Sequence, residues 1–416
     1  MITPLDEQKE LRVAPKSSYR CLELSPDGRL YAAVTINSVE LWSSCGDVML
    51  LTRCSQQRPS GYSKALLKRV FLIWDCDSSS FAVIWSEGRA DYYAVSYGTR
   101  KLEDVYADQD DPIVFPKASL KLSYSTSIEQ FGYPVSACAF GNRILVATDS
   151  GMICELNWKG NSMGRSLSRM MEQATWESSG LQDNQRVMSL SAYSELNCLA
   201  IVLNDSSCYL LDMNNSLQAT NCRRFHMESS ENARQVQFCP SRSLLAVIST
   251  SLTVNVYNVT RNPEDDYALC CDSIALVDVR QIPRLQPSPL YSYDSIVSLT
   301  WCRSQPIFAL GLRYQGLIVW SLQSGVVYTY TASQGDHSSD STTTPEGKEC
   351  IGVATSTEVS CCAFSASGSH LLFNIPYEQV ISPEDGLPYV RESRLFLQPF
   401  YITSDSVSAT YGHDIL

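Results

Sequence analysis

The sequence predicts an all-β chain folded as a seven-bladed β-propeller, and two observations carry this prediction. Short apolar runs separated by tight polar turns recur along the 416 residues, and seven copies of the pattern leave few residues over. In most copies an apolar strand turns into a second strand, and a third strand ends close to an aromatic residue. Repeated antiparallel sheets of this kind are typical of propellers, whose blades have four strands each. The fourth, outer strands are expected in the longer gaps between copies.

The first copy shows why each piece is expected. Cys21–Leu24 and Leu30–Val34 are apolar runs, and Ser25-Pro26-Asp27-Gly28 joins them. The proline presets φ, the aspartate bonds to its own backbone, and the glycine accepts a positive φ, so a tight turn is predicted. The third run, Val39–Trp42, ends on the aromatic residue.

One domain over 1–400 is predicted, followed by a C-terminal tail at 401–416. Three longer stretches, 101–132, 160–185 and 331–349, are interpreted as inter-blade loops, with a short helix within Arg165–Ala174. The blades are expected near 20–60, 69–115, 133–175, 186–225, 233–280, 295–330 and 357–400. Closure of the seven blades would remove the exposed sheet edges that invite aggregation.

The charge balance argues against nucleic acid as a partner. Lys and Arg total 32 and Asp and Glu total 44, which gives a net charge of −12. Nucleic-acid affinity depends mainly on cations that neutralise phosphates, so no such partner is expected. The basic clusters Lys64, Lys68 and Arg69, and Arg223 with Arg224, are interpreted as solvated surface charge.

No targeting or membrane-spanning segment is predicted. Met1–Glu7 lacks the apolar segment of a signal peptide, and no run approaches the roughly 18 apolar residues of a membrane span. The sixteen cysteines include no C-x-x-C pair, and most are interpreted as small buried side chains in a reducing compartment. Cys270–Cys271 and Cys361–Cys362 lie in or beside predicted strands, where neighbouring side chains face opposite ways. No zinc site and no cofactor are expected.

One motif matches that of a hydrolase nucleophile. Gly160-Asn161-Ser162-Met163-Gly164 fits G-x-S-x-G, which activates a serine at a strand-to-helix elbow with an acid and a histidine at hand. The surroundings have the pattern of antiparallel strands, so a glycine-rich turn is the favoured interpretation. An enzyme is the least favoured of three functional hypotheses.

Other chemistry-bearing residues are scattered. The histidines are interpreted as solvated residues of loops, turns or the tail: His226, His337, His370 and His413. The acidic pairs Asp110–Asp111 and Asp265–Asp266 are adjacent in sequence and do not flank a cleft. No catalytic, cofactor-binding or metal-binding residue is therefore predicted, and the partner-binding residues are left unassigned.

The repeats resemble WD40 blades but depart from their consensus. No G-H dipeptide opens the copies and no W-D dipeptide closes them. Trp42, Trp158, Tyr257 and Trp320 hold the aromatic place at the end of the third strand. The His–Asp hydrogen-bond network of strict WD40 blades is therefore expected to be absent, and apolar packing is expected to hold this divergent WD40-like propeller together.

Three segments resemble one particular family of propellers. Ile144–Asn161, Ser295–Val327 and Glu392–Phe400 are similar to blades of the Ric-one family, the large subunits of a Ric-one/Rgp-one exchange factor for a Golgi Rab GTPase. The similarity extends in order over most of 20–400. Because that family's proteins are longer, we expect this chain to be a fragment, a short isoform or an incomplete gene model.

The resemblance implies a role in a protein assembly. It implies a non-catalytic subunit of a Rab guanine-nucleotide exchange factor in endosome-to-Golgi retrograde vesicle traffic, with no exchange residue that can be carried over. The implied partners are an Rgp-one-like subunit and a Golgi Rab GTPase. The implied location is the cytosol and, through partners only, the Golgi membrane surface. The alternative is a generic WD40-type scaffold or adaptor in another assembly, which explains the fold equally well.

Overall fold

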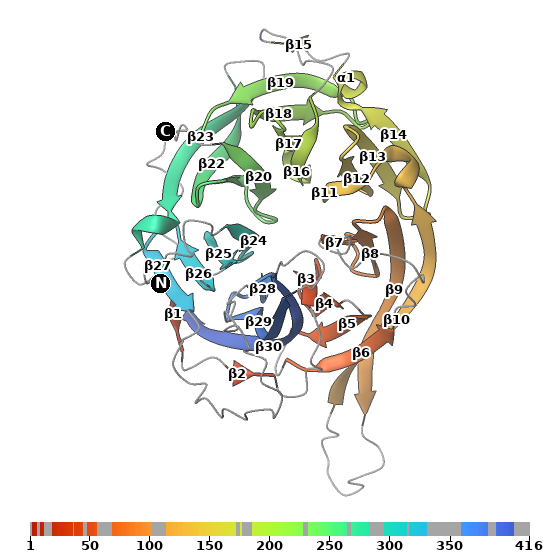
Figure 1. The fold of residues 1–416 in the computed structure, drawn as a ribbon, viewed down its shortest axis with the longest axis vertical. Helices are drawn as coiled ribbons and strands as arrows, with labels where there is room; N and C mark the ends of the chain where they lie inside the picture. The colour runs from red at the N-terminus through yellow and green to blue at the C-terminus, as the bar shows by residue number, and fades with distance from the viewer. Residues whose placement is uncertain are drawn as a thin grey trace, which may run out of the picture. The chain divides into compact units, whose positions relative to one another are not determined.

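Seven largely antiparallel sheets carry nearly all the regular structure of the computed structural model (Figure 1). They confirm the predicted seven-bladed β-propeller. The chain divides into two compact units, Arg20–Arg280 and Met1–Tyr19 with Gln281–Leu416, so a single domain over 1–400 stays a prediction. The structure describes residues 2–5, 9–11, 19–35, 37–44, 48–55, 69–101, 114–171, 175–176, 185–227, 232–263, 268–282, 295–313, 316–330, 359–381 and 388–402.

The unit Arg20–Arg280 contains five sheets, each a meander in chain order. The first two comprise β3 (Tyr19–Leu24), β4 (Leu30–Thr35), β5 (Ser38–Ser43) and β6 (Leu50–Ser55), then β7 (Val70–Trp74), β8 (Ser80–Trp85), β9 (Arg89–Lys101) and β10 (Val114–Ser127). The third comprises β11 (Pro134–Phe140), β12 (Arg143–Thr148), β13 (Met152–Asn157) and β14 (Ser162–Ser166). The fourth comprises β16 (Val187–Tyr193), β17 (Cys198–Leu203), β18 (Cys208–Met213) and β19 (Ala219–Phe225), and the fifth β20 (Ala233–Phe238), β21 (Leu244–Ser249), β22 (Thr253–Asn262) and β23 (Ala268–Asp278).

Short elements complete this unit. The short strand β15 (Thr175–Trp176) pairs in parallel with β19 and gives the fourth sheet a fifth strand. Single helical turns lie between strands: η2 (Glu129–Phe131), α1 (Leu167–Met170), η3 (Ser194–Leu196) and η4 (Val279–Gln281), which ends at the unit boundary.

The other unit contains the last two sheets, and the N-terminus takes part in one of them. The sixth comprises β24 (Ile296–Trp301), β25 (Ile307–Leu312), β26 (Leu317–Ser321) and β27 (Gly325–Tyr330). The seventh comprises β28 (Cys362–Phe364), β29 (His370–Ile381) and β30 (Pro388–Ile402), with β1 (Ile2–Pro4) and β2 (Lys9–Glu10) paired to β30. The sequence pattern had not indicated that the first residues supply the outer strand of the last sheet.

The second blade extends beyond its predicted range of 69–115. The stretch 101–132 was predicted as a loop, but β10 continues to Ser127 and pairs with β9 along its length. The sequence pattern of β10 resembles that of a loop because an outer strand is half-exposed and carries polar side chains such as Lys117 and Lys121. The loop predicted over 160–185 was wrong in the same way, because that stretch contains β14, the outer strand of the third sheet, and the short strand β15. The helix expected within Arg165–Ala174 is the four-residue α1. The predicted loop 331–349 and the tail from 403 onward lie outside the described residues.

The first turn forms as its sequence predicts. Gly28 has φ +74°, and its N–H donates to the Ser25 carbonyl at 2.9 Å. Asp27 Oδ1 accepts from the Ser25 hydroxyl at 2.6 Å and from the Arg29 N–H at 3.1 Å. The side chain thus closes the turn against its own backbone, which fixes the register of β3 and β4.

The hydrophobic core lies between neighbouring sheets. One buried cluster joins Leu145 and Ile153 of the third sheet to Leu199 and Leu211 of the fourth. Another buried cluster joins the fourth and fifth sheets, and others join the first to the second and the second to the third. Each sheet is therefore stabilised by burial against its neighbour, because a single blade has too little apolar surface of its own.

The expectation that apolar packing holds the blades was incomplete. Glu40, fully buried in β5, accepts from the Trp42 indole N–H at 3.2 Å and lies 3.4 Å from Arg53. In the second sheet the Trp85 indole donates to Asp91 at 2.9 Å. These indole–carboxylate bonds give two blades a buried polar anchor without the WD40 histidine.

Serine hydroxyls also link one sheet to the next. The Leu190 N–H donates to Ser136 Oγ at 3.1 Å, which joins β16 to β11. The Val236 and Phe238 N–H groups of β20 donate to Ser189 Oγ at 3.1 Å and Ser191 Oγ at 2.9 Å, both in β16. These acceptors satisfy backbone donors that face a neighbouring sheet and have no partner strand there.

The cysteines behave largely as small apolar residues. Of the fourteen in the described residues, all have free thiols, eight are buried and only Cys76 is exposed. Burial raises the pKa of Cys154 to about 12. Within the described part of the chain, burial of more than half of the cysteines agrees with the predicted role as packing residues. A thiol that stays protonated is also a poor nucleophile.

Candidate protein-docking face

Four sheets share an irregularity at the same place in their first strand. In each of these sheets the second residue of the first strand has no partner on the second strand, so the pairing of the two strands shifts by one residue there. The extra residues are Val135 in β11, Met188 in β16, Arg234 in β20 and Val297 in β24. A β-bulge leaves its extra residue without a partner and re-aims the side chain, and bulges are over-represented beside functional sites. The first three bulges lie on neighbouring sheets of one unit.

A repeated backbone bond holds each bulge in place. The residue after the second strand donates its N–H to the carbonyl of the residue before the first strand. Asp149 donates to Tyr133 O at 2.9 Å, and Asn204 donates to Arg186 O at 2.9 Å. The side chains of the same two residues form a second bond between the strands. Asp149 Oδ1 accepts the Tyr133 backbone N–H at 2.8 Å, and Asn204 Oδ1 accepts the Arg186 backbone N–H at 3.0 Å.

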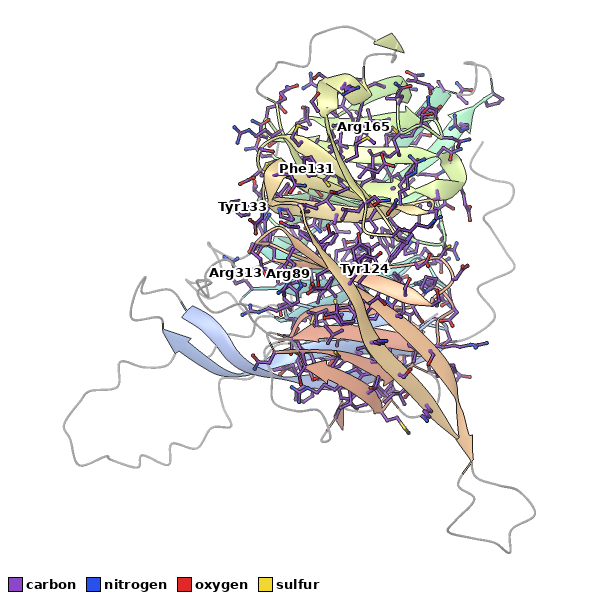
Figure 2. The ribbon with its side chains drawn as sticks, turned by 90° about the vertical axis from the view of Figure 1, so that its right-hand side faces the viewer. Arg89, Tyr124, Phe131, Tyr133, Arg165 and Arg313 are labelled. Atoms are coloured by element: carbon purple, nitrogen blue, oxygen red, sulfur yellow. The ribbon has the colours of Figure 1, made fainter. Side chains whose placement is uncertain are left out.

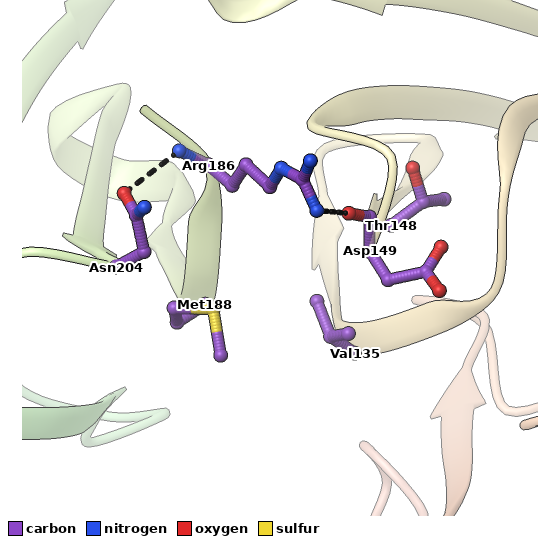
Figure 3. Close-up of a pocket in the computed structure, with 6 residues that line it drawn as sticks. All are labelled: Val135, Thr148, Asp149, Arg186, Met188 and Asn204. Atoms are coloured by element: carbon purple, nitrogen blue, oxygen red, sulfur yellow. Dashed lines mark hydrogen bonds between the residues drawn. The ribbon is translucent and has the colours of Figure 1, made fainter. Parts of the chain in front are cut away.

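An open pocket of about 360 Å³ lies between the third and fourth sheets at these bulges (Figure 3). Arg186 extends across it and donates from Nη1 to the Asp149 carbonyl at 2.8 Å. Its lining residues are Val135, Thr148, Asp149, Arg186, Met188 and Asn204. The pocket therefore has apolar side chains on one part of its wall and a guanidinium above them.

Large apolar side chains are exposed around this pocket. Tyr133 is 48% exposed and Met188 is 40% exposed, while Val135 is half-buried. Tyrosine, methionine and arginine are the residue types enriched at protein interfaces. We call Tyr133, Val135, Arg186, Met188 and Arg234 the bulge face; Figure 2 labels Tyr133.

Asp205, which follows the lining residue Asn204, is engaged within its own loop. Burial alone would raise the pKa of Asp205, but hydrogen bonds from Ser207 and Gln185 outweigh it and lower that pKa. Gln185 Nε2 donates to Asp205 Oδ2 at 2.7 Å. The ionised carboxylate therefore stabilises the β17–β18 turn.

The G-x-S-x-G segment begins in a hairpin turn, as favoured, and continues into the outer strand β14. The Gly160 N–H donates to the Asn157 carbonyl at 3.1 Å, and Ser162 begins β14 opposite Leu156 of the antiparallel strand β13. A nucleophile elbow requires a helix directly after the serine, and here an outer strand follows it.

The two glycines of this motif have a packing role. A Cβ on Gly160 would lie 2.6 Å from the Tyr124 ring, and a Cβ on Gly164 would overlap the Phe131 ring. Tyr124 and Phe131, labelled in Figure 2, come from the end of β10 and the turn after it, so the second sheet packs onto the third through these glycines.

Gly164→Ala is therefore expected to destabilise the protein, whereas Ser162→Ala is expected to leave its stability unchanged. The added methyl group displaces the rigid Phe131 ring, and overpacking of this kind costs about 2 kcal/mol. Urea unfolding of both variants measures the difference. Equal midpoints would show that the glycine has no packing role.

The histidines follow the sequence interpretation only in part. His226 is exposed after β19. The interpretation was wrong for His370, which begins β29 and is half-buried against the turn before it, with Ser365 Oγ accepting its N–H at 3.2 Å. Burial lowers the pKa of His370 to about 4. His337 and His413 lie outside the described residues.

Acid should therefore destabilise the protein through His370. The folded-state pKa is below the unfolded value of about 6.5, so the unfolded state takes up the proton first. Stability is expected to be full above pH 6.5 and to fall by up to about 3 kcal/mol between pH 6.5 and pH 4. Urea unfolding of His370→Gln across this range should show a flatter pH profile, while His226→Gln keeps the wild-type slope.

Of the basic clusters and acidic pairs, only Arg69, Arg223 and Arg224 lie in the described part of the chain. Arg223 donates to the Leu269 carbonyl at 3.2 Å, and Arg224 is exposed on the same strand. Arg69 donates to the Val135 carbonyl at 3.4 Å and so lies beside the bulge face. Lys64, Lys68 and both acidic pairs lie outside the described residues.

The described part of the chain offers no metal site and no membrane span. No three His, Cys, Asp or Glu side chains in it gather closely enough to hold a metal ion. None of its helices is long and apolar enough to cross a bilayer.

Comparison with solved structures identifies WD40 propellers as structural neighbours. The β-propeller domain of Cps50 (Swd1) from Myceliophteria thermophila has a TM-score of 0.59 and 9% identity, over 95% of this chain and 100% of that one. The WD40 repeats of RRP9 have a TM-score of 0.58 and 12% identity, over 96% and 100%. U3-55K has a TM-score of 0.57 and 12% identity, over 95% and 99%. At these identities the likeness establishes the fold alone.

No protein-family model and no curated protein matches the sequence.

Proposed function

We propose that this chain is a protein-binding scaffold of the WD40 propeller type, and that the bulge face is its docking surface. The observation that supports this is the bulge shared by three neighbouring sheets, at which Met188 and Arg234 are exposed and Val135 is half-buried. Rigid strands set these side chains in fixed positions, and fixed positions lower the conformational entropy lost on binding.

A single charge at the centre of the bulge face should abolish binding of such partners. Met188→Asp replaces an apolar part of the pocket wall with a carboxylate, and a partner that covers this wall must then remove water from a charged group, which opposes association. The matched control is Met163→Asp, since Met163 is 54% exposed on β14 and lies outside the bulge face.

Affinity purification with quantitative mass spectrometry measures the effect. Partners captured by the wild type and by Met163→Asp should be lost with Met188→Asp. Retention of the same partners by all three proteins would contradict the assignment of the bulge face as the docking surface.

A second, more specific proposal comes from the resemblance to the Ric-one family. Under this second proposal the chain is a subunit of a Rab guanine-nucleotide exchange factor. It acts at the Golgi in retrograde traffic together with an Rgp-one-like partner. Support comes from the order of similar segments, including Ile144–Asn161 and Ser295–Val327. An exchange factor works by binding the nucleotide-free GTPase preferentially, so a scaffold without acid–base chemistry suffices.

Co-purification tests this second proposal. The chain is expected to bind an Rgp-one-like protein or a nucleotide-free Golgi Rab, with the longer Ric-one family protein as positive control. Binding of the control but of neither partner by this chain would overturn it. Proximity labelling that returns another assembly and no Golgi protein would favour the generic scaffold.

A further inference from the structure

We propose that the turn between β8 and β9 is a proton-sensitive element of the fold. The turn is closed over Glu87 while that carboxyl group holds a proton, and it opens to water when the carboxyl group ionises.

Glu87 is a buried acid with too few partners. It is 5% exposed, and its Oε2 has no hydrogen-bond partner. Its ion pair is long, because Oε1 lies 3.8 Å from Nη2 of Arg89. The hydroxyl of Ser86, the preceding residue, is also buried without a partner. A buried carboxylate is costly unless it is paired and hydrogen-bonded, so the closed turn favours the neutral acid.

The arginine of this turn is held by a different carboxylate. Arg89, labelled in Figure 2, has its Nε 3.2 Å from Asp91 Oδ2 and its guanidinium 5.4 Å from the centre of the Trp85 ring. Asp91 also accepts the Trp85 indole N–H at 2.9 Å and the Ser125 hydroxyl at 2.6 Å. Asp91 and Trp85 therefore position the guanidinium, and one cation faces two carboxylates.

The helical turn η2 packs directly on the turn between β8 and β9. The Ile128 N–H donates to the Gly88 carbonyl at 2.7 Å, and the Gly88 N–H donates to the Trp85 carbonyl at 2.9 Å. A Cβ on Gly88 would lie 2.8 Å from Cγ of Glu129, so a second acid lies close to the buried one. Opening of the turn would break these two backbone bonds, and their amides report on it.

The local charges favour the protonated form of Glu87. The charged side chains that act on it in the described part of the chain are Arg89, Asp91 and Glu129. Burial raises the pKa of the Glu87 carboxyl group, the guanidinium opposes this, and the two other carboxylates add to it. Arg69 contacts the turn through its carbonyl, which accepts the Ser86 N–H at 3.2 Å, while its guanidinium donates to the Val135 carbonyl at 3.4 Å.

The direction of the pH dependence follows from linkage. The folded state binds the Glu87 proton at a higher pH than the unfolded state does, so its contribution to stability is full below the ordinary pKa of 4.5. The contribution is lost as the pH rises through the raised pKa of the folded state. His370 acts in the opposite direction in the other unit, so a local measurement is needed to separate the two groups.

Hydrogen exchange between about pH 5.5 and about pH 8 tests the inference in the full chain. After correction for the intrinsic exchange rate, wild-type peptides that contain Gly88 and Ile128 should lose protection as the pH rises. Glu87→Gln imitates the neutral acid, so it should keep the protection of the protonated form throughout. Glu129→Gln is the matched control, because it removes an exposed acid beside the same turn and should keep the wild-type pH dependence.

Three results would overturn the inference. One is wild-type protection of this turn that does not change with pH, and another is a Glu87→Gln variant with the wild-type pH profile. The third is loss of the pH dependence in Glu129→Gln, which would assign the titration to Glu129.

Discussion

Gly311→Ala is expected to lower the free energy of unfolding of its unit by about 3 kcal/mol. Gly311 lies in β25 opposite Ser298, the residue that follows the bulge in β24. A Cβ there would overlap both the Ser298 hydroxyl and the carbonyl oxygen of Val359. A backbone carbonyl cannot swing aside as a flexible side chain can, so the sheet itself must shift. The Ser298–Val359 hydrogen bond of 3.2 Å would be lost at the same time.

Hydrogen exchange with mass spectrometry measures the loss of stability in the strands around Gly311. Amides of β24 to β27 should lose protection in Gly311→Ala, because local opening becomes easier when its free energy falls. Gly98→Ala is the matched control, since a Cβ at that glycine meets nothing within 4 Å. Wild-type protection in the Gly311 variant would refute the steric argument.

Removing two serines of β16 should be at least as damaging as the glycine change. In Ser189→Ala/Ser191→Ala, the buried N–H groups of Val236 and Phe238 lose their acceptors. A buried donor without a partner costs about 2 kcal/mol, so the double variant is expected to lose about 3–4 kcal/mol. The loss is less than additive if β20 shifts to find water.

Chemical denaturation of the single and double variants gives the coupling between the two bonds. Ser96→Ala is the control, because its hydroxyl pairs with Ser119 at 2.6 Å on an exposed strand, where water replaces the lost bond. If the double variant and the control unfold at the same denaturant concentration, these serines do not hold the sheets together.

Sequence patterns predicted the strands well because the information is local. In Leu30–Val34 and Val39–Trp42 the apolar runs indicate buried strands, and Asp27 and Gly28 close the turn between nearby segments without help from the rest of the chain. The outer strand β10 was missed because its exposed lysines and serines carry no apolar signal. β1 was missed because three residues are too few to show a period.

The bulge face could not be predicted in the same way. Val135 and Met188 sit in apolar runs, and nothing in those runs states that each has no partner on the next strand. A weak signal was present, since a serine follows the bulge residue in β11, β16 and β24. That signal gains meaning only once Ser136 and Ser189 are seen to accept backbone donors from the neighbouring sheet.

The sequence by itself determined the number of sheets, the order of the three inner strands in each, and the turn that includes Gly160. Tertiary structure alone decided which strand registers shift, which aromatic rings need Gly160 and Gly164, and which side chains reach the surface together. The physical reason is the distance along the sequence over which each feature is specified. Turns and strand periods depend on residues a few positions apart. A bulge depends on the pairing of two strands, and a ring packed on a glycine or a shared face depends on contacts between segments farther apart still, such as Phe131 with Gly164 and Ser136 with Leu190.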